Sequence, residues 1–329
     1  MLLGVRAMIE KANAEGGIRG RRIELKTLDD QGNAGKAAEN ATALVRDPSV
    51  VALFGGIEGG PCVAQIKVAT DAQVPLVACM SGSPEHRDPH NPYVFPVRAG
   101  HYDEFAKLIE QALRYGMGRI AFLHADSDTG RKHLANVRKL MAAQGKELAL
   151  ALAIPGGGAK PDPKALAKQL VVNRDVAVFN RGNFALYVQV MREVRALGAS
   201  TQFMAVNSGA QQMVRLLGAD AKGLIFTQVV PFPWGREVPV VREYEAAVKR
   251  LDPGAQPSFS SLEGYISAKV LVEGLRRAKV ISREGLVQSL EGMASYDTGG
   301  LVVSYSREAH RGATFVDTVV ATAKGDFRR

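Results

Sequence analysis

Small and polar residues cluster where predicted β-strands end, and these clusters are the residues best suited to chemistry. Two of the clusters, Gly55–Pro61 and Met80–Pro84, follow successive apolar segments. Turns of this kind present backbone N–H groups and hydroxyls, which hold anions such as carboxylates next to a helix N-terminus. For the first loop, a tight turn without a ligand is the alternative. The two loops together predict a concave anion-binding surface.

Polar residues also end the strands predicted in the middle of the chain. They are Asp126–Thr129, Asn180–Asn183 and Asn207–Ser208. They could form a second wall that faces the same ligand. They could equally cap the helices that follow, because Asn, Asp and Ser are preferred at helix N-termini.

The motifs of nucleotide-binding proteins and hydrolases are missing from the sequence. The Gly55–Pro61 loop has neither the GxGxxG spacing nor the lysine of a phosphate-binding loop, and there is no GxSxG turn. His86 and His90 lie in a loop with prolines, so we expect solvated side chains there and no metal pair. The sequence therefore predicts no enzyme activity, no cofactor and no metal.

The two cysteines, Cys62 and Cys79, lie 17 positions apart in the chain. They form no CxxC motif and have no histidine at the spacing of a zinc ligand. A disulfide, which would fit an oxidising compartment, and two buried free thiols remain equal alternatives.

Composition points to a soluble globular protein with room for two domains. The 329 residues are 46% hydrophobic and 23% charged, and no apolar run reaches the roughly 18 residues that span a bilayer. The net charge is +9, but the basic residues are scattered among acids and have no aromatic neighbours, so we expect no nucleic-acid partner. No signal peptide is predicted within the chain.

Strands and helices are predicted to alternate about every 12 to 15 residues, which is typical of βαβ units in parallel sheets. Strands are expected at 22–28, 50–55, 74–80, 93–97, 119–124, 147–154, 176–179, 202–207, 223–228, 301–304 and 315–321. The alternation changes after Val230–Trp234, where three helices follow one another. A first strand is expected to be missing, because Met1 opens directly into a helical pattern.

Five segments carry a family resemblance. They are MLLGVRAMIEKANAEGGIRGRRIELKTLDDQGNAGKAAENATALV, VVALFGG, VPLVACMSGSPE, STQFMAVNSG and FSSLEGYISAKVLVEGL. In this order they resemble the solute-binding proteins of ABC importers of the branched-chain amino-acid (Leu/Ile/Val) type, and the resemblance runs through essentially the whole chain. It implies a type I periplasmic binding fold of the α/β class, with two doubly wound parallel-sheet lobes joined by a three-segment hinge. Lobe one would comprise residues 1–98 and 229–314, and lobe two 99–228 and 315–329.

The resemblance also implies a set of ligand-binding positions, namely Gly60, Met80, Ser81, Gly82, Thr129, Gly182, Asn183 and Asn207. The strand-end loops and the long helix at 258–278 add Glu58, Gly59, Ser83, Arg181 and Phe259 as further candidates. Gly60 and Gly82 stand where the Leu/Ile/Val binders have a serine and a threonine. Asn207 stands where an acid meets the ammonium group of the ligand. An amide forgoes that charge-assisted bond, which is worth about 1.5–3 kcal/mol, so we expect an organic acid without an α-ammonium group, with Arg181 as its counter-ion.

Other assignments stay open. Glu58 could supply the missing acid and restore amino-acid binding, or Glu58 and Arg181 could pair with each other or point to water. Phe259 and Tyr265 could form an apolar wall. A ligand-sensing regulator or receptor domain on the same fold is the alternative function. The resemblance further implies a small-molecule solute, a membrane permease as partner, a monomer, and a periplasmic or lipid-anchored location.

Overall fold

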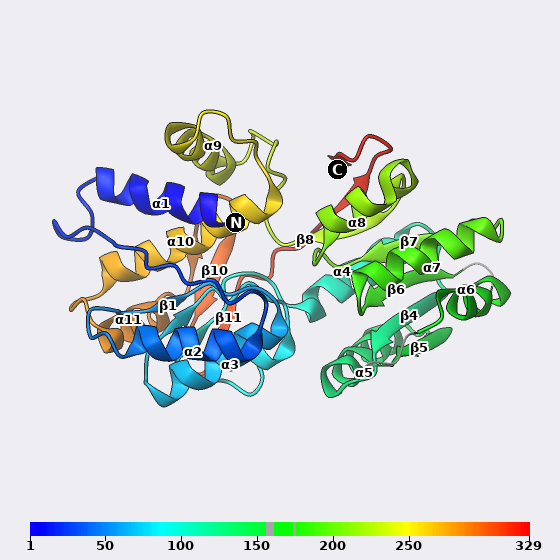
Figure 1. Cartoon of the computed structure of the whole chain (residues 1–329), viewed down its shortest axis with the longest axis horizontal. Helices are drawn as coiled ribbons and strands as arrows, with labels where there is room; N and C mark the ends of the chain where they lie inside the picture. Colours follow the sequence, from blue (N-terminus) through cyan, green and yellow to red (C-terminus); the bar gives the residue numbers. More distant parts are fainter. Residues whose placement is uncertain (156–160, 174–175) are drawn as a thin grey trace. The chain divides into compact units, whose positions relative to one another are not determined.

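The computed structural model describes residues 1–155, 161–173 and 176–329. The chain forms two compact units, and each is assembled from two stretches of sequence. Unit 1 comprises Met1–Gly100 and Val229–Phe315, and unit 2 comprises His101–Gln228 and Val316–Arg329 (Figure 1). Within the described ranges no helix is both long and apolar enough to cross a membrane.

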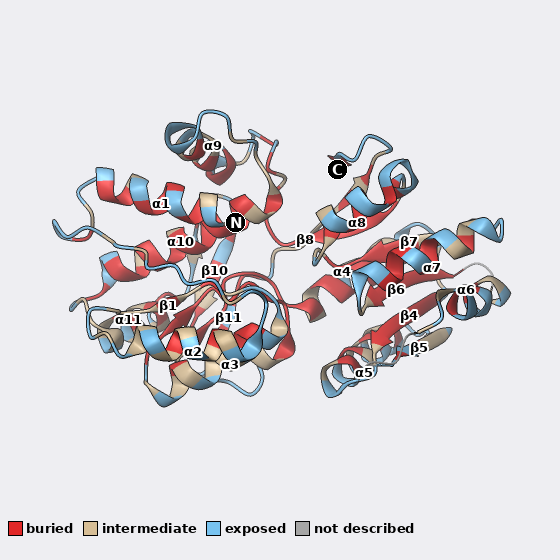
Figure 2. Ribbon diagram, viewed as in Figure 1, coloured by how far each residue is buried: buried red, intermediate tan, exposed pale blue. Residues whose placement is uncertain are grey.

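Unit 1 surrounds a short parallel sheet with helices. Its elements are α1 (Leu2–Ala14), α2 (Ala34–Val45), β1 (Leu53–Phe54), α3 (Gly59–Asp71), β2 (Leu76–Val77), η1 (Pro84–His86), β3 (Val94–Phe95), α9 (Pro239–Leu251), α10 (Phe259–Arg277), α11 (Arg283–Glu291), β9 (Tyr296–Asp297), β10 (Val302–Tyr305) and β11 (His310–Gly312). The parallel sheet has the order β1-β2-β3, and β11-β10-β9 form a second, antiparallel sheet. Most of the buried residues of this unit lie on the sheets and on the inner faces of the helices (Figure 2).

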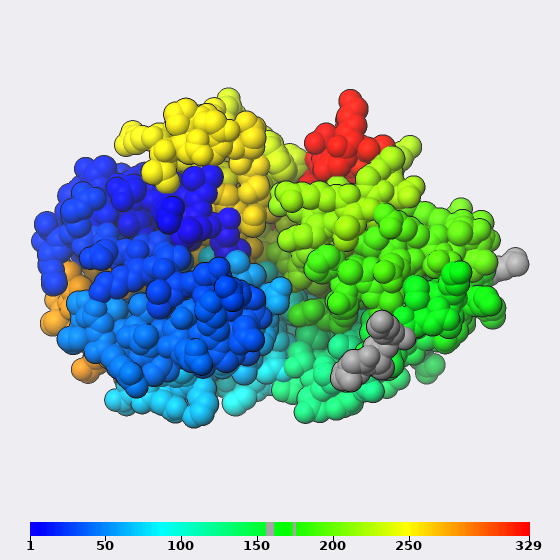
Figure 3. All heavy atoms as spheres, viewed as in Figure 1, coloured from blue at the N-terminus to red at the C-terminus, as the bar shows by residue number. Residues whose placement is uncertain are grey.

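The parallel sheet of unit 1 is buried against α2 and α3. Leu53, Leu76 and Cys79 pack there with residues of both helices. Strands covered by helices on both faces read as continuous apolar runs, which is why LFGG and VPLVAC were recognisable as strands. Residues of the N-terminal segment, dark blue in Figure 3, lie at the surface of this unit.

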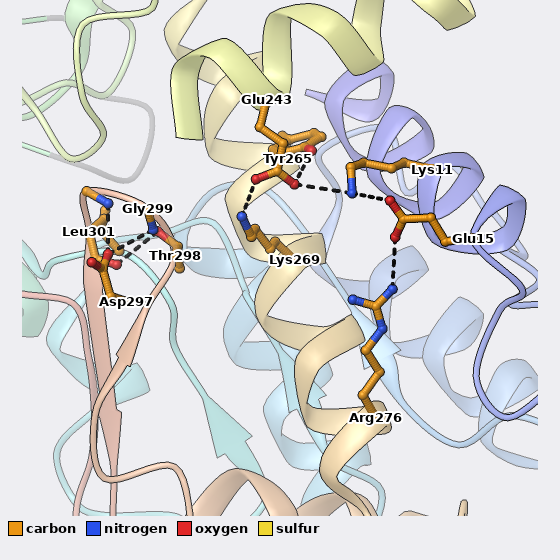
Figure 4. Close-up of polar contacts among 11 residues, drawn as sticks. Lys11, Glu15, Glu243, Tyr265, Lys269, Arg276, Asp297, Thr298, Gly299 and Leu301 are labelled. Carbon is orange, nitrogen blue, oxygen red and sulfur yellow. Dashed lines mark hydrogen bonds and ion pairs between the residues drawn. The ribbon is translucent and has the colours of Figure 1, made fainter. Parts of the chain in front are cut away.

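A polar network joins α1, α9 and α10 (Figure 4). Glu243 on α9 accepts hydrogen bonds from the Tyr265 hydroxyl, at 2.8 Å, and from Lys269 on α10. Lys11 on α1 lies 3.6 Å from the same carboxylate. Burial opposes ionisation of Glu243, but the bonds from Lys269 and Tyr265 leave its pKa below the ordinary value. These contacts link segments that are more than 200 positions apart in sequence.

Unit 2 is built on one seven-stranded sheet. Its elements are α4 (His101–Arg114), β4 (Ile120–Ala125), α5 (Asp128–Ala142), β5 (Leu150–Ile154), α6 (Pro163–Val172), β6 (Ala177–Arg181), α7 (Phe184–Ala196), β7 (Gln202–Ala205), α8 (Ala210–Leu217), η2 (Gly218–Ala221), β8 (Ile225–Gln228), β12 (Asp317–Ala321) and β13 (Phe327–Arg328). The order is β13-β12-β8-β7-β6-β4-β5, and the five strands β4 to β8 run parallel. Phe105, Phe122, Phe179 and Met204 form its core with α4 and α5.

The secondary structure corrects several sequence-based boundaries. Arg22–Leu28 forms no strand, although its residues alternate as predicted, because no strand within the described residues pairs with it. The strands expected at 50–55, 74–80 and 93–97 shorten to β1, β2 and β3. The short strands β9, β11 and β13 were not predicted, because two or three residues carry no periodicity. The α/β prediction and the parallel strands of both units are confirmed.

Candidate ligand-binding site

The first strand-end loop leads from β1 into the N-terminus of α3. Gly55 and Gly56 have positive φ angles of 82° and 94°, which glycine adopts without strain. Glu58 is the residue before α3; it has φ of 71° and is exposed, and its side chain makes no capping bond. The first N–H groups of α3 therefore have no side-chain cap from this position, and they carry the positive end of the helix dipole.

The second strand-end loop lies against this helix N-terminus. Ile57 and Met80 form a parallel bridge, and the Met80 N–H donates to the Gly56 carbonyl at 2.9 Å. Ser81 and Ser83 are buried, as is Gly82 between them. A Cβ atom added to Gly59 would lie 3.9 Å from the Ser83 hydroxyl and 4.0 Å from the Ser81 hydroxyl. Two hydroxyls and the first turn of α3 are therefore brought together.

A disulfide holds the two loops in this arrangement. The Sγ atoms of Cys62, on α3, and Cys79, just before Met80, are bonded at 1.99 Å. Both cysteines are buried in the core beside Leu53 and Leu76. The covalent link therefore ties the first turn of α3 to the residue that precedes the second loop.

His86 lies next to this disulfide, and its predicted solvation is wrong. The side chain is only 3% exposed, and its Nδ1 lies 3.3 Å from the Ser81 carbonyl, whereas His90 is exposed. Burial and the nearby Arg87 lower the pKa of His86 to about 4, so the ring is neutral. A ring nitrogen of His86 and the two sulfur atoms lie within 4.8 Å of one another. The sulfur atoms bond each other, so this group is no thiolate site as it stands.

In unit 2, three of the predicted residues lie at strand ends near helix N-termini. Asn183 caps α7, since its side chain accepts hydrogen bonds from the N–H groups of Ala185 and Leu186. Thr129 lies in the first turn of α5, and Gly182 is packed so tightly that a Cβ would meet Ile154 at 2.7 Å. Asn183 thus performs the capping role that the sequence left open.

Arg181 and Asn207, predicted to contact the ligand, are linked by two buried residues that the sequence analysis missed. Arg181 Nε donates to His101 Nδ1 at 3.2 Å. A guanidinium only donates, so His101 carries its proton on Nε2, 4.0 Å from Glu104 Oε1. Glu104 Oε2 accepts the Asn207 backbone N–H at 3.0 Å and also the Thr227 hydroxyl. Arg181 at the end of β6 is thus bonded to His101, and the ends of β7 and β8 are bonded to Glu104, one helical turn further along α4.

A signal for these two residues exists in the sequence. His101 and Glu104 are 1% and 0% exposed, and both lie on α4, the helix whose Phe105 and Leu108 enter the core. A carboxylate placed next to the apolar positions of an amphipathic helix indicates a buried polar contact, because an unpaired buried charge is too costly to retain.

The two aromatic residues expected to form an apolar wall, Phe259 and Tyr265, lie in different surroundings. Phe259, at the start of α10, is 7% exposed and contacts the rings of Phe232 and Trp234, with centroids 6.0 and 5.6 Å away. Trp234 is 45% exposed. Tyr265 is fully buried against Tyr244 and bonds Glu243, so it belongs to the helix core rather than to a ligand wall.

The structure therefore brings the predicted residues together in two groups. In unit 1, Gly59, Ser81 and Ser83 surround the N-terminus of α3, while Glu58 and Gly60 are exposed beside it. In unit 2, Arg181 and Asn207 are bonded to His101 and Glu104, two residues of α4. The first group offers the N–H groups of α3 and the Ser81 hydroxyl as donors, whereas the Ser83 hydroxyl already donates to Glu85. The second group offers a guanidinium, so both groups are suited to an anion.

Comparison with known proteins identifies the family of the chain. The family model for periplasmic binding proteins matches residues 1–326. The chain is 25% identical over 309 residues to the Leu/Ile/Val-binding protein homolog 7 of Brucella abortus (strain 2308), covering 87% of this chain and 75% of the relative.

Two solved structures show the same fold. An extracellular ligand-binding receptor from Verminephrobacter eiseniae EF01-2 superposes with a TM-score of 0.87 at 26% identity, covering 99% of this chain and 94% of the other. A branched-chain amino acid ABC transporter protein, described as putative, from Rhodospirillum rubrum gives 0.73 at 20% identity, covering 99% and 93%. With a match over nearly its whole length, the chain belongs to the periplasmic binding protein family, has the type I fold and resembles Leu/Ile/Val-binding members of that family.

Proposed function

We propose that this protein is the solute-binding component of an ABC importer and captures a small organic carboxylate that lacks an α-ammonium group. Binding would draw the two units together on the solute, because a ligand that contacts both units shifts the population toward the closed state by its differential affinity. An aromatic or other organic acid is favoured over a branched-chain amino acid.

The observation that carries this proposal is the arrangement at the N-terminus of α3. Helix N–H groups, the two hydroxyls of Ser81 and Ser83, and Gly59 lie together, and Glu58 makes no capping bond there. Such a group binds carboxylates through several weak donors aided by the helix dipole. The absence of a side chain at Gly59 leaves room for the ligand to approach the backbone.

Unit 2 supports a carboxylate without an ammonium group. Glu104 is buried and accepts hydrogen bonds from the Asn207 N–H and the Thr227 hydroxyl. Its carboxylate therefore bonds groups of the protein rather than an ammonium group of the ligand. Asn207 itself contributes an uncharged amide at the position where related binders carry an acid. Arg181, oriented by His101, supplies a positive charge instead.

The remaining parts of the proposal follow from the family. A solute-binding protein delivers its ligand to a permease in the membrane and acts outside the cytoplasm, and we propose both for this chain. We also propose that it acts as a monomer and catalyses no reaction. The two strand-end groups bind the solute in this assignment.

A thermal-shift screen tests the function directly. The purified protein is heated with two panels, one of branched-chain and polar amino acids, the other of aromatic and aliphatic carboxylates. A ligand at 100 times its Kd adds about 2.7 kcal/mol to the free energy of unfolding, which a melting curve resolves. Stabilisation by carboxylates supports the proposal, and stabilisation by amino acids alone contradicts it.

A Glu58→Gln variant separates the two ligand classes. If Glu58 holds an ammonium group, the variant loses amino-acid binding, and the protein is then an amino-acid binder. If the ligand is a simple carboxylate, Glu58→Gln leaves its affinity unchanged or raises it, since a nearby negative charge is removed. Glu39→Gln, on the neighbouring helix α2, controls for a general change in surface charge.

A further inference from the structure

Two sulfur atoms and an imidazole ring lie together inside unit 1. The Sγ atoms of Cys62 and Cys79 and a ring nitrogen of His86 all lie within 4.8 Å of one another, and the three residues are 0%, 2% and 3% exposed. They share no metal-binding motif in the sequence, so only the fold brings them together. Thiolates and imidazole are ligands that soft metal ions prefer. The group therefore has the donor atoms of a metal site once its disulfide is open.

The ring of His86 is held in the way that a metal ligand is held. Its Nδ1 lies 3.3 Å from the Ser81 carbonyl. A carbonyl only accepts, so Nδ1 carries the proton and Nε2 keeps its lone pair. Nε2 is buried and has no hydrogen-bond partner within the part of the chain that the structure describes. Because an imidazole that binds a metal generally donates its other N–H to a carbonyl or carboxylate, Nε2 is the nitrogen left to bind a cation.

Reduction of the disulfide is the step that frees the sulfur ligands. A dithiol reductant transfers two electrons and two protons to the bond between Cys62 and Cys79, which becomes two thiols, while the reductant becomes a disulfide. A cation that binds both sulfur atoms then displaces the two thiol protons. Metal–ligand bonds of about 2.0–2.3 Å hold their ligand atoms roughly 3.5–4.5 Å apart, which is close to the spacing that the folded chain imposes on this group.

The number of ligands and the charge around them favour Cu(I) over zinc. Structural zinc is almost always held by four ligands, whereas no further His, Cys, Asp or Glu of the described residues joins these three. Cu(I) is soft and is stable with few ligands. Two thiolates, a neutral imidazole and Cu(I) leave one negative charge. Arg87 and Arg98 both act electrostatically on His86, opposed by Glu85, so positive charge predominates beside the ring and offsets that charge.

We propose that the reduced chain binds one Cu(I) ion through Cys62 Sγ, Cys79 Sγ and His86 Nε2. The ion takes the place of the disulfide bond and ties the first turn of α3 to the residue before Met80. Because the same two sulfur atoms form either the disulfide or the bonds to the metal, the oxidised chain does not bind the ion. The proposal does not depend on which solute the protein captures.

The test compares the reduced and the oxidised form of the full chain. Since both sulfur atoms are buried, the chain is reduced in denaturant with a water-soluble phosphine, which becomes its oxide, and is refolded without oxygen. Circular dichroism checks that the helices have re-formed. Cu(I) is then titrated into each form in competition with a coloured Cu(I) chelator. The proposal expects the reduced form to take one equivalent of Cu(I) from the chelator and the oxidised form to take none.

Three results of this comparison and of two histidine variants overturn the proposal. Equal uptake by both forms assigns the copper to adventitious surface groups. A reduced chain that does not refold, with or without Cu(I), has no such site. His86→Asn should bind Cu(I) at least about tenfold more weakly than the reduced parent, because loss of a second-shell partner alone costs about 10- to 100-fold. His90→Asn, at an exposed position of the same loop, should bind like the parent, and equal affinities of the two variants exclude the imidazole as a ligand.

X-ray absorption at the copper edge of the reduced parent gives a readout that needs no variant. The proposal expects two sulfur atoms and one nitrogen around the metal, and a shell of sulfur alone, or of nitrogen and oxygen alone, contradicts it. Zn(II) is titrated in the same way against a zinc chelator. If the reduced chain takes one equivalent of Zn(II), loses it in His86→Asn and takes no Cu(I), the site binds zinc and the choice of Cu(I) is wrong.

Discussion

The Nε–H of Arg181 donates to Nδ1 of His101 across 3.2 Å, although the two residues are 80 positions apart. This bond orients the guanidinium at the end of β6 and uses one of its five N–H donors. His101 is buried on α4, so the charge of Arg181 is held by a residue of the core.

Replacing Arg181 tests its role as counter-ion. We expect Arg181→Met to weaken binding of the carboxylate found in the screen by about 10- to 150-fold, because a charge-assisted hydrogen bond contributes about 1.5–3 kcal/mol. Arg181→Lys should recover part of this loss, since the charge returns without the guanidinium geometry. Isothermal titration calorimetry measures both, and Arg114→Met, on exposed Arg114 of α4, should bind normally. Unchanged affinity in Arg181→Met would assign the arginine a structural role.

Glu104 should matter for stability. In Glu104→Gln, the amide nitrogen replaces one oxygen of a carboxylate whose Oε2 accepts two hydrogen bonds. We expect the free energy of unfolding in urea to fall by about 1–3 kcal/mol, since hydrogen-bonding groups are left without a matching partner. Glu110→Gln, on the exposed face of the same helix, should change it by less than about 0.5 kcal/mol. Similar values for both variants would contradict a buried polar chain.

The stability of unit 1 should depend on pH through His86. Its pKa is lowered to about 4 by burial, whereas an unfolded histidine titrates near 6.5. As pH falls from 6.5 to 4, the unfolded state therefore binds a proton that the native state does not, and stability decreases by up to about 1.4 kcal/mol per pH unit. Burial also lowers the pKa of His310 to about 4, so it adds a similar dependence.

His86→Asn removes the His86 contribution to this pH dependence. The slope of unfolding free energy against pH between 6.5 and 4 should then be smaller than in the parent protein, even if the variant is less stable at every pH. His90→Asn, at an exposed position in the same loop, should keep the parent slope. An unchanged slope in His86→Asn would show that the ring is protonated as readily in the folded protein as in the unfolded one.

The disulfide should stabilise unit 1 and the ligand loops together. Cys62 and Cys79 close a loop of 17 residues, for which chain entropy gives about 3 kcal/mol. We expect the Cys62→Ser, Cys79→Ser double variant to lose about that much stability and to bind the solute more weakly, because α3 is released from the Met80–Ser83 loop. A reductant should leave the folded parent protein unaffected, since both sulfur atoms are buried. Equal melting temperatures of parent and double variant would refute the stabilising role.

Local pattern was sufficient to predict most of the fold. The parallel strands of unit 2 were recognisable because each is a buried apolar run followed by a polar helix start, as at Ala177–Arg181. Arg22–Leu28 was wrongly predicted as a strand because alternation describes the segment alone, whereas a strand also requires a neighbour. The same limit applies to β9 and β13, each of which is two residues long and exists only through its partner.

The site was predictable only in part. Strand-end loops such as Met80–Ser83 can be predicted from the sequence because they are rich in small residues. Pairings between distant residues, such as Arg181 with His101 or Asn207 with Glu104, depend on how α4 packs against the ends of the strands. The spacing of residues along the sequence does not indicate such pairings. The burial of His86 was missed for the same reason, because a loop rich in proline usually lies in solvent, and here the disulfide and Ser81 enclose it.

The packing of α1 on α10 has a consequence for how the protein is made. Gly4 approaches the Ser261 carbonyl so closely that a Cβ atom would lie 1.8 Å from it, and Gly264 approaches the Met1 carbonyl in the same way. A ribosome completes α1 more than 240 residues before it completes Gly264. During most of that interval the two helices on which α1 packs, α9 and α10, have not yet been synthesised. Unit 1 therefore completes its packing only late in translation. The nascent chain should be a substrate for chaperones that shield apolar segments.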